Sequence, residues 1–166
     1  TNTAALAFGG EGPAPVGKTG ATESWNGTSW TTTPATMNTA RFAMGSCGAT
    51  NTAALAFGGQ EPAPLYADTE TWNGTSWTEV NDLNTVRSAL AGAGTNTAAL
   101  AFGGLTTGPS ILKNTESWNG TAWTELNDLT TQRFYLAGDG TNTAALAFGG
   151  SPVPASPLFG ETESYN

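Results

Sequence analysis

The sequence predicts an all-β protein of β-propeller type, built from repeats of 45 to 49 residues, in which each blade has four antiparallel strands and the chain holds about 3.5 blades. Read as a strand, the segment TNTAALAFGG places Ala4, Leu6 and Phe8 on one face and small residues on the other, before a Gly-Gly stop. No 3.6-residue apolar period occurs, so helical repeats are excluded. The segment occurs identically at residues 1–10, 50–59, 95–104 and 141–150.

The third repeat shows the expected order of strands. Its four predicted strands are residues 87–94, 97–104, 115–118 and 121–126. The first begins at Arg87 and is rich in small residues, and the second carries no charge on either face, which indicates burial on both sides. A variable segment, 105–114, follows. Asn119-Gly120 joins the last two strands, and we expect a type I′ hairpin turn there.

The chain forms a single repeat domain, 1–166, with a period of 45 to 49 residues. The repeat units are approximately 1–40, 41–86, 87–132 and 133–166. The first unit starts at its second strand and the last ends after its third, so the units supply 3, 4, 4 and 3 strands. We therefore expect that the chain joins a second copy in one ring or belongs to a longer repeat protein; a compact four-bladed monomer with two incomplete blades is the alternative.

Several marks together resemble the kelch repeat over the whole chain. They are an arginine that opens a small-residue strand, a strand that ends in Gly-Gly, an aromatic residue that closes the third strand and a Trp that opens the fourth. The resemblance implies blades around an axis, with the Arg-led strand innermost and the Trp-led strand outermost. Ala replaces the larger aliphatic residues usual in kelch strands. The near-identical repeats resemble those of bacterial and phage-encoded repeat proteins.

Composition excludes several function classes. The net charge of −8 supplies no basic field for nucleic acid or for an anionic membrane. The chain has no histidine, which removes the usual catalytic triads and imidazole metal sites. The copper oxidase that shares the kelch fold needs histidine ligands, so its activity is not carried over. We expect no catalytic residue, no metal and no cofactor, and we interpret the single cysteine, Cys47, as a small packing residue.

A glutamate recurs two positions before the aromatic residue that closes each third strand. Identical carboxylates in identical repeats share one environment, whereas a pair of catalytic carboxylates needs two different ones. We therefore predict structural ion pairs within each blade, because a buried guanidinium needs a partner. The predicted pairs are Arg41 with Glu70, Arg87 with Glu116 and Arg133 with Glu163, and they leave Glu23 without an arginine.

The six tryptophans allow two interpretations. Packing between blades would bury them, because large aromatic side chains dominate core energetics and the strands around them are rich in Ala. Stacking on sugars would expose their faces to ligand. We favour packing, since the tryptophans frame each Asn-Gly hairpin at one spacing.

The segments after each Gly-Gly differ in length and chemistry while the strands barely change. We call them variable loops 1 to 4; they are residues 11–21, 60–68, 105–114 and 151–160. Prolines would stiffen these loops and lower the entropy lost on binding, although loops also drift when nothing constrains them. The candidate ligand-binding residues are Lys18, Glu61, Tyr66, Asp68, Lys113 and Phe159.

We expect a non-enzymatic binding module that recognises a glycan or a protein through these loops, outside the cell or on a virion. The alternative is a structural repeat protein that self-associates and takes no small-molecule ligand. Loop exchange that abolishes glycan binding would favour the first, and ordered ligand-free oligomers would favour the second.

Overall fold

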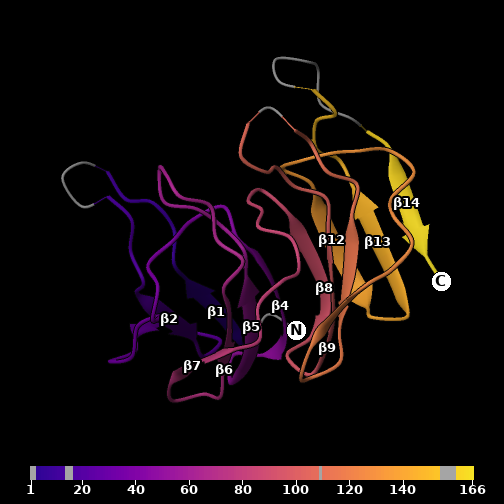
Figure 1. The fold of residues 1–166 in the computed structure, drawn as a ribbon. Helices are drawn as coiled ribbons and strands as arrows, with labels where there is room; N and C mark the ends of the chain where they lie inside the picture. Colours follow the sequence, from indigo (N-terminus) through magenta and orange to yellow (C-terminus); the bar gives the residue numbers. More distant parts are fainter. Residues whose placement is uncertain (1–2, 14–16, 109, 154–159) are drawn as a thin grey trace.

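The computed structural model describes residues 3–13, 17–108, 110–153 and 160–166. Over these residues the protein is all-β and forms four antiparallel sheets, which we call blades 1 to 4 (Figure 1). Blade 1 contains β1 (Ala5–Phe8), β2 (Thr22–Trp25) and β3 (Trp30–Thr32). Blade 2 contains β4 (Gly45–Thr50), β5 (Ala53–Phe57), β6 (Thr69–Trp72) and β7 (Trp77–Val80). Blade 3 contains β8 (Ala91–Thr95), β9 (Ala98–Phe102), β10 (Thr115–Trp118) and β11 (Trp123–Glu125). Blade 4 contains β12 (Ala137–Thr141), β13 (Ala144–Phe148) and β14 (Thr162–Tyr165).

Strand order within each sheet follows the chain, as expected for blades of a β-propeller. Within the described ranges the blades have 3, 4, 4 and 3 strands, which confirms the predicted distribution. In the part of the chain that the structure describes, no Arg-led inner strand precedes β1 and no Trp-led outer strand follows β14. The sheets do not close into a ring.

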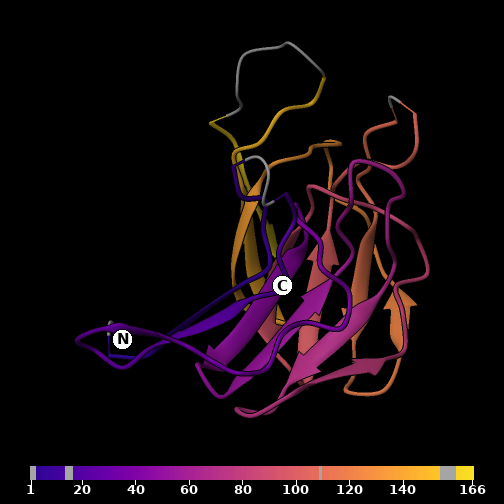
Figure 2. The same cartoon turned by 90° about the vertical axis from the view of Figure 1, so that its left-hand side faces the viewer.

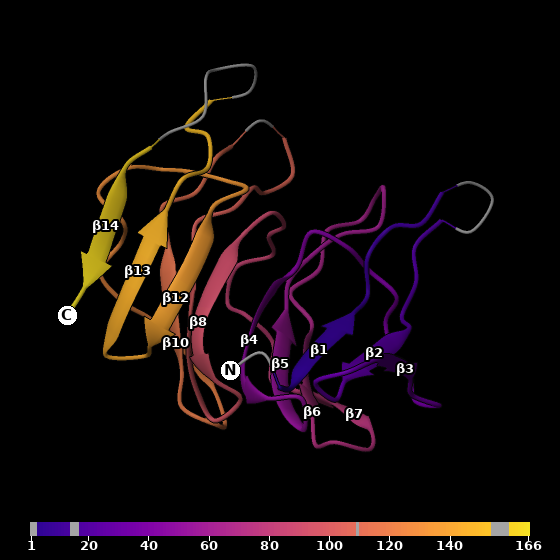
Figure 3. The ribbon, with the colours of Figure 1, turned by 180° about the vertical axis from the view of Figure 1, so that it is seen from behind.

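The inner strands β4, β8 and β12 pack side by side (Figure 3). Their small residues permit this approach. A Cβ added at Gly138 would lie 2.7 Å from the carbonyl oxygen of Gly92 in the neighbouring blade, so glycine is needed where the two strands meet. The propeller axis therefore runs along these strands, and the strand order places the Trp-led strands outermost.

The inner strands begin later than the sequence predicts. The predicted strand 87–94 is observed as β8, which starts at Ala91. Ala89 has a φ of 54°, in the left-handed region, so the chain bends between Arg87 and the strand. The bend brings the N–H of Ala89 to the carbonyl oxygen of Ala43, at 2.6 Å, and joins blade 3 to blade 2.

The predicted type I′ turns are wrong. Trp72 pairs with Trp77, so the hairpin loop has four residues rather than two. Gly74 has a positive φ, 93°, whereas Asn73 does not. Instead the side-chain oxygen of Asn73 accepts hydrogen bonds of 2.9 Å from the N–H groups of Thr75 and Ser76, which forms an Asx turn. The equivalent asparagines, Asn26 and Asn119, accept the same pair of bonds.

The core lies between the blades. In β5 and β9 the Leu and Phe side chains and the alanines beside them are buried, so these strands are covered on both faces, as predicted. The same segment in β1 and β13 is covered less completely because each lies in an incomplete end blade.

Candidate binding face

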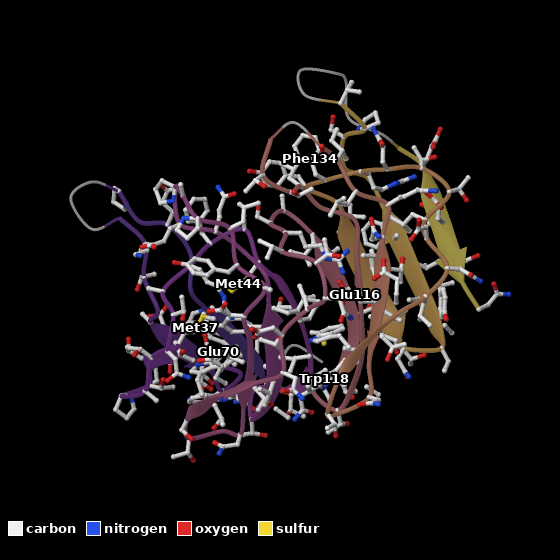
Figure 4. All side chains as sticks on the ribbon, in the orientation of Figure 1. Met37, Met44, Glu70, Glu116, Trp118 and Phe134 are labelled. Carbon is white, nitrogen blue, oxygen red and sulfur yellow. The ribbon has the colours of Figure 1, made fainter. Side chains whose placement is uncertain are left out.

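The four variable loops leave the sheets at the same end of the molecule, which is the upper end in Figures 1 and 2. The repeated apolar strands are β1, β5, β9 and β13. Each runs toward this end and is followed by a Gly-Gly pair, after which the variable loop begins. The connections between blades reach the same end, where Phe134 lies (Figure 4). This end, which we call the loop face, collects the most divergent parts of the sequence.

Three of the predicted ligand-binding residues come together on the loop face. The ammonium group of Lys18, in variable loop 1, forms an ion pair with Glu61, in variable loop 2. The Tyr66 hydroxyl donates a 2.7 Å hydrogen bond to the other carboxylate oxygen of Glu61. The side chains of Lys18 and Glu61 remain 36% and 25% exposed, so this cluster presents charged and hydroxyl groups to solvent.

A hollow of about 320 Å³ lies between variable loops 2 and 3. Its wall combines proline and leucine side chains with a few hydroxyl and amide groups. It is lined by Gln60, Pro62, Ala63, Pro64, Leu65, Ser88, Leu105, Thr106, Thr107 and Gly108. The volume and the mixed lining are typical of a small-ligand site.

The polar groups at the floor of this hollow are held in place. The Ser88 hydroxyl donates a 2.7 Å hydrogen bond to the side-chain oxygen of Gln60. Backbone hydrogen bonds pair Ser88 with Leu105, and an antiparallel bridge pairs Gln60 with Leu65. The hollow is therefore built on paired backbone rather than on free loop.

Sequence reasoning missed the hollow. The signal was Ser88, which follows the arginine at the position where the neighbouring repeats carry Phe42 and Phe134. A small residue at this one position leaves space that phenylalanine would fill. The sequence pattern places this position only in a predicted inner strand.

The remaining predicted ligand-binding residues do not join the cluster of Lys18, Glu61 and Tyr66. Asp68 lies 3.6 Å from Arg41 and accepts a 3.3 Å hydrogen bond from the Thr39 hydroxyl. Lys113 forms a 3.5 Å ion pair with Asp128, in the connection to blade 4. Phe159 lies outside the described residues.

The three predicted arginine–glutamate pairs are present. The nitrogen–oxygen distances are 3.2 Å for Arg41 with Glu70, 2.9 Å for Arg87 with Glu116 and 2.6 Å for Arg133 with Glu163. Glu70 and Glu116 lie within the complete blades (Figure 4). Among the described residues Glu23 contacts no arginine and accepts a hydrogen bond from Thr32 instead.

The arginines are buried completely and differ in how fully they are bonded. Arg87 also donates to the carbonyl oxygens of Gly103 and Asn114, at 3.2 and 2.8 Å. Arg41 reaches Glu70 only at ion-pair distance, without an aligned hydrogen bond in the described structure. Burial lowers the pKa of Arg41 and of Arg87, and the neighbouring carboxylates oppose that effect. These contacts give the arginines a structural role.

The tryptophans of blades 2 and 3 are buried. Trp72, Trp77, Trp118 and Trp123 are at most 6% exposed, so their faces are not open to a sugar. Packing between blades, the favoured interpretation, is confirmed for these four. Trp30 differs, because it is 49% exposed.

Cys47 packs as predicted, against the core of blades 2 and 3. Its thiol lies 3.5 Å from the carbonyl oxygen of Thr95. Part of the residue is accessible, yet burial of the thiol raises its pKa to about 12. The thiolate, which is the reactive form, is therefore scarce at neutral pH.

The described residues contain no group of three or more Cys, Asp or Glu side chains placed to hold a metal ion. They also contain no helix that is long and apolar enough to span a membrane. No protein-family model matches the chain, and a search of curated proteins finds no relative.

Proposed function

We propose that the protein is a non-enzymatic binding module, a kelch-like propeller that recognises a glycan through its loop face. One observation carries the proposal. The sequence differences between repeats collect at one end of the blades, and there they form both a hollow and an exposed polar cluster.

The chemistry of the hollow favours a neutral sugar. Hydroxyl and amide groups of Gln60, Thr106 and Thr107 can exchange hydrogen bonds with sugar hydroxyls, while Pro62 and Leu105 offer apolar contact. The acidic chain disfavours an anionic ligand. A protein ligand is the other outcome of the same screen.

The proposal assigns the protein no catalytic role. Three of the four repeated glutamates, Glu70, Glu116 and Glu163, are engaged with arginines, and the chain has no histidine to act as a general base at neutral pH.

A glycan array and calorimetry on the array hits would test the proposal. Ser88→Phe should abolish binding, because the larger side chain, which stands at this position in two other repeats, would fill the hollow. Asn73→Ala, in a hairpin at the opposite end, should leave affinity unchanged. Binding that survives Ser88→Phe, or an array without hits, would contradict the glycan site.

The structural alternative has its own support. The two end blades expose apolar side chains that are buried in the middle of the chain. Oligomers that form without ligand would favour this function.

A further inference from the structure

Blades 1 and 2, and blades 2 and 3, pack through the same pair of contacts. The Phe8 ring of blade 1 packs edge-on against Trp77 of blade 2, with ring centroids 4.7 Å apart. The Trp77 indole N–H also donates a 2.9 Å hydrogen bond to the hydroxyl of Thr22 in blade 1. A phenylalanine and a threonine of one blade thus receive the outer-strand tryptophan of the following blade.

The interface between blades 2 and 3 repeats these contacts. Phe57 packs edge-on against Trp123 at 5.0 Å, and the Trp123 indole N–H donates a 3.1 Å hydrogen bond to the hydroxyl of Thr69. The interface is therefore a property of the repeat and not of one pair of blades.

Blade 1 exposes the tryptophan half of this interface. Trp30 occupies the position of Trp77 and Trp123 in its outer strand. It is 49% exposed, against 6% for each of the other two. The described chain supplies no earlier blade to cover it.

Blade 4 exposes the other half. Leu146 and Phe148 are 46% and 39% exposed, whereas the equivalent Leu55 and Phe57 are fully buried. Thr162, the equivalent of Thr22 and Thr69, is also exposed. The two ends of the chain thus carry complementary halves of an interface that the chain itself forms twice.

We propose that blade 4 of one copy binds blade 1 of a second copy. Trp30 of one copy packs against Phe148 of the other and donates its indole N–H to the Thr162 hydroxyl there. The internal interfaces identify the occupant, because they show these residue types in contact. Both end blades of the described chain expose apolar side chains, Trp30 in blade 1 and Leu146 and Phe148 in blade 4.

This contact is head-to-tail, so it joins two different surfaces. Two copies supply twice the four sheets of one chain, or eight, which is within the range of propeller rings. A second contact of the same kind then closes the ring. The proposal develops the assembly alternative and does not depend on a ligand at the loop face.

Mixing two broken variants tests the proposal by light scattering. Trp30→Ser removes the tryptophan half of the interface in blade 1 and keeps the phenylalanine half in blade 4. Phe148→Ser removes the phenylalanine half and keeps the tryptophan half. Wild type should have about twice the 16.9 kDa chain mass. Each variant by itself should have the mass of one chain, and an equimolar mixture should return to two chains through one intact contact.

Val86→Ser is the matched control, since Val86 is an exposed apolar residue on a connection between blades, 43% exposed. It should leave the mass of the wild-type assembly unchanged. Circular dichroism checks that each variant is folded. If Phe148→Ser unfolds, Thr162→Val replaces it, because this change removes only the hydrogen-bond acceptor and should raise the dissociation constant several-fold.

Three outcomes would overturn the proposal. They are a wild-type monomer at the highest attainable concentration, a mixture that stays monomeric, and loss of association in one variant but not in the other, which would indicate a symmetric contact. Because all samples are free of ligand, none of these results bears on the glycan site.

Discussion

Asn84 donates two hydrogen bonds to one carboxylate oxygen of Glu116, 2.7 Å from its backbone N–H and 2.9 Å from its side-chain amide. Asn84 lies in the connection that leaves blade 2, and Glu116 lies in the third strand of blade 3. The other carboxylate oxygen accepts from Arg87. One buried glutamate therefore fastens the connection, the arginine and the strand together, and Asn38 binds Glu70 in the same way.

Glu116→Gln should destabilise the protein by about 3 to 5 kcal/mol, because it leaves the buried Arg87 charge uncompensated. Urea denaturation measures the loss. The control is Asp128→Asn, which removes the partner of a lysine that is 56% exposed and should cost at most about 1 kcal/mol. A small loss for Glu116→Gln would contradict the structural role of the pair.

Trp77→Ala should cost about 3 to 5 kcal/mol of folding free energy, since the indole is 6% exposed and bonded to Thr22. Trp30→Ala, at the equivalent position of blade 1, should cost about 0.5 kcal/mol in dilute solution, where the chains are separate. Thermal melts of both variants compare one residue type in two blades. Equal losses would show that Trp30 is as buried as Trp77.

Periodicity predicted the blades because every repeat carries the same strands and the same terminating Gly-Gly pair. The strand count and the arginine–glutamate pairs followed from that period. The start of the inner strand did not, because the bend depends on Ala89, whose positive φ no propensity indicates. The turn type also failed, because the Asn73 side chain, rather than a positive φ at Asn73, shapes the loop.

The candidate site was predicted in part. Divergence among the loops indicated the loop face and the candidate residues Lys18, Glu61 and Tyr66, which the structure places in contact. Sequence could not show that Asp68 turns toward Arg41, since that depends on how the loop returns to the sheet. The hollow could not be predicted from the sequence, because it depends on the pairing of Ser88 with Leu105 in the folded chain.

Stability should fall as the solution is acidified through the titration of Glu163. Burial raises the pKa of Glu163, but hydrogen bonds from Thr130 and Thr131 and the charge of Arg133 outweigh it, so the pKa lies below the ordinary value of 4.5. The folded state therefore binds the proton less tightly than the unfolded state does. The contribution is present above about pH 4.5 and is lost as pH falls through the lower pKa of the folded state.

Melting temperatures between neutral pH and pH 3 measure this loss. Glu163→Gln should lower the melting temperature at neutral pH and make it less sensitive to acid than wild type. An unchanged acid dependence in the variant would show that Glu163 titrates at its ordinary value.

Gly92→Ala should destabilise the protein by about 1 to 3 kcal/mol through overpacking. A Cβ at Gly92 would lie 2.5 Å from the Phe57 ring and 2.8 Å from the carbonyl oxygen of Ser46, both in blade 2. Ser46 holds the equivalent position in blade 2 and is exposed, since the described residues include no inner strand of blade 1 beside it. The cost therefore arises from the close approach of two inner strands and not from the strand itself.

The matched control for Gly92→Ala is Gly160→Ala, where an added Cβ would meet no atom within 4 Å. Its melting temperature should equal that of wild type. Gly138→Ala should behave like Gly92→Ala, since its Cβ would lie 2.4 Å from the Phe102 ring. If all three variants have the melting temperature of wild type, the inner strands are farther apart in solution, and the blades do not pack around a common axis.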